Sequence, residues 1–152
     1  MTERELMSII YIQAQIDKIN NRIAELEDED GLGSVNMDGM PHGSTPGNPV
    51  ERMAMARAAL HEKLMNLRAD KLEKELEIRE YIDTVDEYDV QLIMEWRYID
   101  LMDWHDIALE WEDVSGQRLD RTTLAKRLQK YLQKRRENPH FSHSSRGVVD
   151  II

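Results

Sequence analysis

A run of cationic side chains near the C-terminus is the feature of this sequence most able to do chemistry. The segment from Arg121 to Arg136, RTTLAKRLQKYLQKRR, carries seven Lys and Arg and no Asp or Glu. Like charges at helical spacing repel one another by about 0.2–0.5 kcal/mol per pair, so a helix that needed only solubility would mix the two signs. The run therefore indicates contact with a polyanion, and nucleic acid is the first hypothesis. The alternatives are an acidic protein surface, including the chain's own N-terminal half, and a plain solvated helix face.

The rest of the chain has the opposite charge. The 152 residues carry a formal net charge of −10, yet residues 1–114 sum to −16 and residues 115–152 to +6. Binding responds to the local field and not to the average, so a polyanion would be repelled by the first part and attracted by the second. There is no cysteine, no signal peptide and no apolar run of about 18 residues. These features predict a cytoplasmic protein without a membrane span.

Residues that could catalyse or hold a metal are sparse and badly spaced. His140 and His143 lie three apart without a third ligand nearby, and His61-Glu62 lacks the second His of a zinc-protease helix. The acidic run at 27–30 is interpreted as a solvated helix end. No phosphate-binding Gly-rich loop and no nucleophile elbow occur. The sequence therefore predicts no enzyme, no metal and no cofactor.

The elements that must position the basic segment are predicted to be helices throughout, which gives an all-α fold. Residues 3 to 29 carry a heptad stripe typical of a coiled-coil hairpin, formed by Ile9, Ile12, Ile16, Ile19, Ile23 and Leu26. Residues 30–49 hold five of the seven Gly and three of the four Pro, which predicts a loop, mobile by composition. Asn48-Pro49 then starts a second helix that runs to Ile82.

The second helix is expected to pack antiparallel on the first, which makes residues 1–82 a helical hairpin. Its packing stripe is predicted to hold Met53, Leu60, Leu64 and Leu67, and to continue after a phase slip through Leu72, Leu76 and Ile78. The heptads allow this intramolecular pairing and equally a homodimer formed through the hairpin.

Three shorter helices are predicted in residues 83–137, followed by a flexible tail at 138–152. They cover residues 87–99, 104–112 with Asp103 as cap, and 121–136 after a Ser-Gly turn. In the last helix Leu124, Leu128, Tyr131 and Leu132 share a packing side, expected to lie on the apolar face of the helix before it. The cationic side is expected to point outward.

Two helices joined by a turn, with the second basic on its outer face, have the layout of a DNA-binding helix-turn-helix, in which the second helix enters the major groove. The residues predicted to face the bases are Arg121, Thr122, Thr123, Lys126 and Arg127. Those predicted to contact phosphates are Arg118, Lys130, Lys134, Arg135 and Arg136.

The run MEWRYIDLMDWHDIALEW resembles the region-4-like helix-turn-helix of sigma factors. With the stretch MPHGSTPGNPVERM at 40–53, the layout resembles small phage transcriptional regulators of the ArpU/RinA type. The resemblance implies activation of phage late or packaging genes through upstream double-stranded DNA, with contact to host RNA polymerase as a further expectation. The segment EWEDVSGQRLD is several residues longer than the usual turn of such domains.

The predicted function is thus a sequence-specific DNA-binding transcriptional regulator. Two alternatives stay open. One is a DNA-packaging recognition subunit of the small-terminase kind, which would assemble as a ring. The other is a coiled-coil adaptor that binds RNA polymerase or another protein, with the basic helix serving protein contact.

Overall fold

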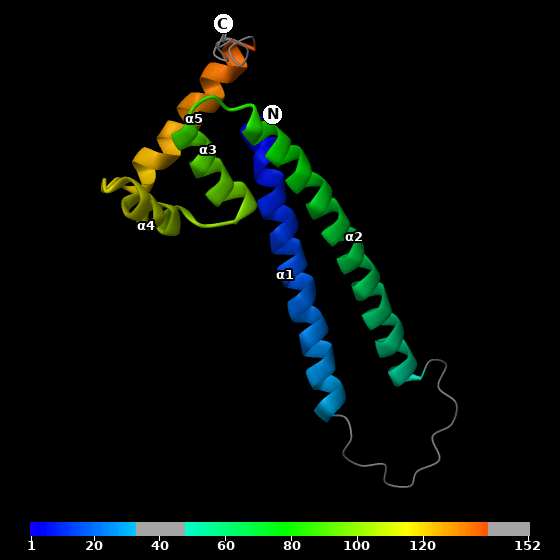
Figure 1. The fold of residues 1–152 in the computed structure, drawn as a ribbon. Helices are drawn as coiled ribbons and strands as arrows, with labels where there is room; N and C mark the ends of the chain where they lie inside the picture. Colours follow the sequence, from blue (N-terminus) through cyan, green and yellow to red (C-terminus); the bar gives the residue numbers. More distant parts are fainter. Residues whose placement is uncertain (33–47, 140–152) are drawn as a thin grey trace, which may run out of the picture. The chain divides into compact units, whose positions relative to one another are not determined.

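The computed structural model describes residues 1–32 and 48–139, and every regular element in these ranges is a helix, so the all-α prediction is confirmed (Figure 1). The elements in chain order are α1 (Glu3–Leu32), α2 (Pro49–Asp83), α3 (Tyr88–Met94), the π-helix η1 (Glu95–Ile99), α4 (Trp104–Ser115) and α5 (Arg121–Glu137). Most of the predicted loop at 30–49 and of the predicted tail at 138–152 lies outside the described residues. None of the helices within those ranges is long and apolar enough to cross a membrane.

The two long helices start at sequence-encoded caps. At the start of α1, Thr2 and Glu5 bond reciprocally: the Glu5 amide donates to Thr2 Oγ1 at 3.3 Å, and the Thr2 amide donates to Glu5 Oε2 at 2.6 Å. The hydrogen bond from Thr2 lowers the pKa of Glu5. Before α2, the Asn48 Oδ1 accepts from the Val50 amide at 3.1 Å. This confirms the predicted Asn-Pro helix start.

The chain divides into two compact units that differ from the predicted boundary at 82/83. The hairpin unit comprises Tyr11–Leu72, and the C-terminal unit comprises Met1–Ile10 with the chain from Glu73 onward. In the hairpin unit α1 and α2 run antiparallel (Figure 1). There Ile16, Ile19, Ile23 and Leu64 form a buried cluster, flanked by Ile12, Leu60 and Leu67. The predicted heptad stripe of α1 is thus confirmed as a packing face.

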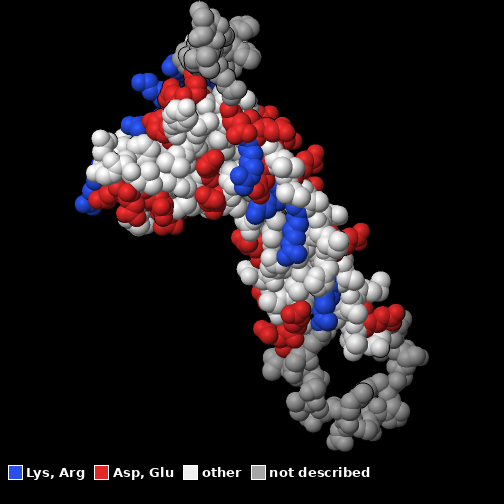
Figure 2. Space-filling model, viewed as in Figure 1, with Lys and Arg blue, Asp and Glu red and all other residues white. Residues whose placement is uncertain are grey.

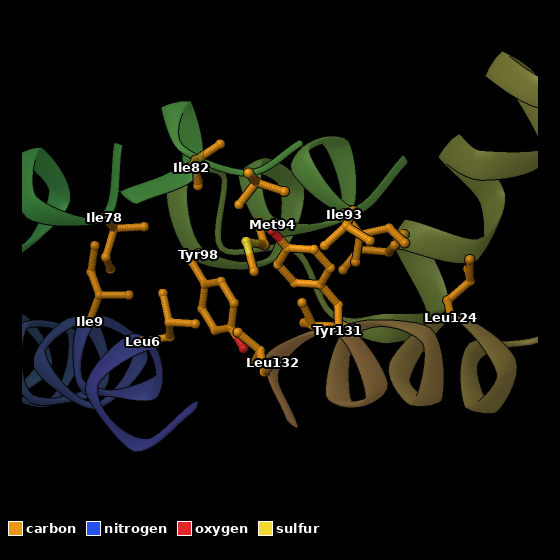
Figure 3. Packing of buried hydrophobic residues seen from close by; sticks show 14 of the residues in the cluster. Leu6, Ile9, Ile78, Ile82, Ile93, Met94, Tyr98, Leu124, Tyr131 and Leu132 are labelled. Atoms are coloured by element: carbon orange, nitrogen blue, oxygen red, sulfur yellow. The ribbon is translucent and has the colours of Figure 1, made fainter. Parts of the chain in front are cut away.

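The C-terminal unit contains the larger core (Figure 3). Leu6 and Ile9 from the start of α1 and Ile78 and Ile82 from the end of α2 join the same buried cluster as α3, η1, α4 and α5. Tyr98 lies in this cluster at 2% exposure, and burial raises its pKa to about 12. Since both ends of the hairpin contribute side chains to this core, they fold with the C-terminal helices.

The predicted continuation of the α2 packing stripe is wrong at Leu72 and Leu76 and correct at Ile78. Leu72 and Leu76 are 60% and 55% exposed, whereas Ile78 and Ile82 are buried. The side of α2 that carries Leu64 and Leu67 continues through Lys71 and Lys74, both half-buried, to reach Ile78. The long alkyl stems of lysine can cover an apolar neighbour while the ammonium stays in water, so the packing side need not stay hydrophobic in sequence.

The connection from α3 to α4 is short and tightly bonded. The predicted helix at 87–99 forms as α3 and the π-helix η1, whose closing bond runs from the Asp100 amide to the Glu95 carbonyl at 2.9 Å. Leu101 has a positive φ of 57°, and the Arg97 guanidinium donates to the Met102 carbonyl at 2.9 Å. The guanidinium also lies 5.3 Å from the centre of the Trp104 ring. Together these contacts fix where α4 begins.

Helix α4 starts as predicted and ends later. Asp103 caps it, because its Oδ1 accepts from the Asp106 amide at 2.9 Å, a bond that lowers the pKa of Asp103. The helix continues to Ser115, three residues beyond the predicted end, and Gly116 closes it in the left-handed conformation at φ 69°. The extra helical residues take up most of the long predicted turn, leaving Gly116–Asp120 between α4 and α5.

Candidate nucleic-acid interface

Helix α5 packs through the predicted apolar side. Leu124, Leu128, Tyr131 and Leu132 are 0–9% exposed and share one buried cluster with Ile107 and Trp111 of α4 and with Val90, Ile93 and Met94 of α3. Trp104 is half-buried against the same cluster. This side anchors α5 on both neighbouring helices, so its opposite side faces solvent.

The outward side of α5 is polar and cationic. Of the predicted DNA-contacting residues, the exposed ones are Arg118, Arg121, Thr122, Thr123, Lys126, Lys130, Lys134 and Arg136. At 100° per residue Thr122, Lys126 and Lys130 lie within about 80° of one another, on the side away from Leu124. Gln129 and Gln133, which the sequence prediction omitted, are exposed beside them. Their amides can both donate and accept hydrogen bonds, as base edges require.

Arg127 lies elsewhere than predicted. Its Nη1 contacts Asp89 Oδ2 at 3.0 Å, and its guanidinium lies 5.3 Å from the centre of the Trp111 ring. Arg127 occupies the border of the packing side, about 60° from Leu124 on a helical projection. Its side chain therefore bridges α5 to α3 and α4, where it supports the position of α5.

Two further predicted phosphate contacts also turn toward the protein. Lys134 Nζ lies 3.8 Å from Glu87 Oε1. Arg135 donates through Nη2 to Thr84 Oγ1 at 2.6 Å, and its guanidinium lies 4.4 Å from the centre of the Tyr81 ring. The expectation that the whole cationic side points outward is thus correct for part of the helix only.

The partners of these cations come from an acidic segment that the sequence prediction missed. Residues 83–89, DTVDEYD, join α2 to α3 and run beside the C-terminal half of α5. The Tyr131 hydroxyl donates to Asp86 Oδ1 at 3.1 Å. Burial raises the pKa of Tyr131 to about 12, nearby Arg135 opposes the rise, and Asp86 adds to it. The opposite charges of this segment and of α5 were the only sequence signal for the contact.

The N-terminus of α5 is capped by Asp120. Its Oδ1 accepts from the Thr123 amide at 2.6 Å, and hydrogen bonds from Thr123 hold the pKa of this carboxyl below its usual value. Because the cap occupies this amide, the Thr123 backbone N–H is not available to a phosphate. Contacts at this end would come from the side chains of Arg121, Thr122 and Thr123.

A groove of about 590 Å³ lies between α4 and the start of α5. It is lined by His105, Ala108, Leu109, Glu112, Arg118, Leu119, Asp120, Arg121 and Thr123. Its lining holds two arginines and two carboxylates, so the groove itself has no strong net charge. Beyond it, the solvent side of α4 is acidic through Asp106, Glu110 and Asp113. In Figure 2 red atoms gather over α4, while blue atoms lie along the outer edge formed by α5 and the turn before it.

No group of three or more His, Asp or Glu side chains in residues 1–32 and 48–139 is placed to hold a metal ion. Helix α5 is thus anchored through its apolar side and exposes a cationic side, next to the acidic solvent side of α4. No family model, no curated protein and no solved structure matches the chain.

Proposed function

We propose that the chain is a sequence-specific double-stranded DNA-binding transcriptional regulator, in which α4 and α5 act as a helix-turn-helix. The observation that carries the proposal is the exposed side of α5, where Thr122, Lys126 and Lys130 project from a helix whose other side is buried. A helix held in this way can enter a major groove without unfolding. No Asp or Glu occurs from Arg121 to Arg136, so no carboxylate in this stretch would repel the DNA phosphates.

The positions of the side chains suggest a division of roles within the predicted set. Thr122, Thr123 and Lys126 would face base edges, with the Lys126 ammonium also neutralising a phosphate beside them, and Arg118, Arg121, Lys130 and Arg136 would contact phosphates. Arg127, Lys134 and Arg135 would position α5 through the acidic segment at 83–89. The resemblance to phage regulators of the ArpU/RinA type adds late or packaging genes as the target, and bacterial RNA polymerase as a second partner.

The test is a titration of the full chain against random and phage-genomic DNA fragments at several salt concentrations. If the five cations assigned to DNA, at 118, 121, 126, 130 and 136, each neutralised a phosphate, log K would fall with log salt at a slope of about −4.5. The variant Lys126→Ala/Lys130→Ala should lose fragment selection and make the slope shallower by about 1.8. Alanine favours helix, so α5 should persist in the variant.

The matched control is Lys18→Ala/Lys63→Ala, which removes two exposed lysines from the hairpin unit. It should bind like the wild type. If the wild type and Lys126→Ala/Lys130→Ala bind weakly and alike, the DNA-binding proposal fails. The basic helix would then serve a protein contact, as the adaptor hypothesis requires. Binding that is tight but equal on all fragments would remove sequence specificity.

A further inference from the structure

A second surface lies on α2, on the side turned away from α1. Of the ten large hydrophobic side chains exposed in the described residues, five lie on α2: Val50, Met55, Met65, Leu72 and Leu76. Within the hairpin unit Met65 is 70% and Leu72 60% exposed. Isolated exposed hydrophobic residues are ordinary, but apolar residues that share one side of a helix mark a surface for a partner, and within the hairpin unit Met65 and Leu72 share one side of α2.

The row has a regular repeat. Ala58, Met65, Ala69 and Leu72 lie within about 60° of one another on a helical projection, and the polar His61 shares their side. Ala58 and Ala69 are 11 residues apart, as are His61 and Leu72. An 11-residue spacing keeps side chains on one line of a nearly straight helix. We call this row the α2 stripe.

The two edges of the α2 stripe carry opposite charges. Arg57 and Arg68, 11 residues apart, lie along one edge, while Glu51 and Glu62, also 11 apart, lie along the other. Each pair falls about 40–80° from the centre line, on opposite sides of it. An apolar row between a basic edge and an acidic edge has the charge pattern of a helix that pairs with a parallel copy of itself.

Symmetry decides the orientation. When two identical helices pair in parallel about a two-fold axis along their length, the basic edge of each faces the acidic edge of the other. When they pair antiparallel, the basic edges meet and so do the acidic edges. The parallel pairing brings Arg57 of one copy opposite Glu62 of the second copy, five residues later, which is the spacing of interhelical ion pairs in parallel coiled coils.

We propose that a second copy of this chain binds along the α2 stripe, with the two α2 helices parallel. Residues 51–72 span about 33 Å of helix. Ala58 and Ala69 allow close approach of the two helices, and Met65 and Leu72 supply the apolar contact. The α1 helix of the same chain occupies the other side of α2, through Leu60, Leu64 and Leu67, so the stripe stays open to a partner. The proposal does not depend on DNA binding.

The first measurement is the mass of the full chain by light scattering over a dilution series without DNA. The expected mass is about twice that of the 17.9 kDa chain. Met65→Glu/Leu72→Glu should give a monomer, because it places carboxylates in the apolar row. Leu109→Glu/Val114→Glu is the matched control, since it changes two residues of α4 that are 52% and 64% exposed. It should still dimerise.

The second measurement tests the orientation with Glu62→Arg. In the parallel pairing this variant places like charges opposite Arg57 and should weaken the dimer. In an antiparallel pairing Glu62→Arg would relieve repulsion between the acidic edges and strengthen the dimer. The exchange Arg57→Glu/Glu62→Arg should restore the parallel dimer, provided that its circular dichroism and melting match those of the wild type.

A dimer that persists in Met65→Glu/Leu72→Glu overturns the proposed surface, and one that tightens in Glu62→Arg overturns the orientation. A chain that stays monomeric at all concentrations overturns the proposal, and the α2 stripe would then be a surface for a different protein. A larger closed ring, as a packaging subunit would form, also overturns it, because the two-fold pairing closes on itself.

Discussion

Replacing Arg127 by alanine separates a positioning role from a DNA-contacting role. Arg127 bonds Asp89 at 3.0 Å and lies 5.3 Å from the centre of the Trp111 ring, whereas the neighbouring Lys126 is exposed. We therefore expect Arg127→Ala to lower the stability of the fold, and Lys126→Ala to lower DNA affinity with stability unchanged. The two variants remove the same charge from adjacent positions, so they are controls for each other.

The size of the stability loss follows from the two contacts. The Arg127 and Asp89 side chains are each 38% exposed, so solvent screens their ion pair, which contributes about 0.2–1 kcal/mol. The contact between the guanidinium and the Trp111 ring adds about 0.5–1 kcal/mol. The sum is roughly 1–2 kcal/mol, and each kcal/mol lowers the melting temperature of a chain this long by about 2–4 °C. Lys126→Ala should leave the melting temperature within about 1 °C.

The assays are thermal melting by circular dichroism and DNA titration by fluorescence anisotropy, below the melting temperature of both variants. The salt slope should become shallower by about 0.9 in Lys126→Ala and stay unchanged in Arg127→Ala. A double-mutant cycle with Asp89→Ala should give a coupling energy of about 0.5 kcal/mol or more. Arg127→Ala that melts like the wild type and makes the slope shallower as Lys126→Ala does would refute the assigned role of Arg127.

Two further predictions follow from the tyrosines and from Gly116. The folded pKa values of Tyr98 and Tyr131 are raised to about 12, so their contribution to stability is complete below the unfolded pKa of about 10 and is lost as the pH rises through 12. Phenolate absorbance should show a late phase that Tyr98→Phe and Tyr131→Phe each reduce, and a titration without that phase would contradict the burial of these rings. Gly116→Ala meets no atom within 4 Å but must adopt φ 69°, so it should destabilise by about 1 kcal/mol, and Gly116→Asn by less, in urea denaturation.

Local sequence signals predicted the elements well, because caps and periodicity act over a few residues. Asp103 caps α4 and Asn48 precedes α2 as expected, and α5 begins at Arg121 as predicted. The heptads of α1 also predicted its buried side. The late end of α4 was missed because the Ser115 hydroxyl donates to the Trp111 carbonyl at 2.6 Å, which supports one more helical turn than the Ser-Gly pair suggested.

Which residues of α2 join the core of the C-terminal unit depends on contacts between residues far apart in sequence. The hydrophobic pattern of α2 alone cannot predict these contacts. Leu72 and Leu76 are apolar and lie near the unit boundary, so the hydrophobic pattern placed them in the packing stripe together with Ile78. The core buries Ile78 and also Ile82, which the pattern did not include, because Leu6 and Ile9 join the same cluster there. This choice leaves Leu72 at the surface, where it contributes to the α2 stripe.

Contacts between residues far apart in sequence also determine which cations of α5 are exposed, and the local sequence pattern could not predict these contacts. A helical projection treats each side chain as inward or outward, but a long arginine about 60° from the packing side can reach either way. Its direction is set by what lies opposite, and Asp89 is 38 residues earlier in the chain. The acidic segment at 83–89 thus engages Arg127, Lys134 and Arg135, and leaves Lys126 and Lys130 exposed. Fewer than seven positive charges of α5 are therefore available to the proposed DNA partner, and Lys126 and Lys130 lie on the side that faces away from the core.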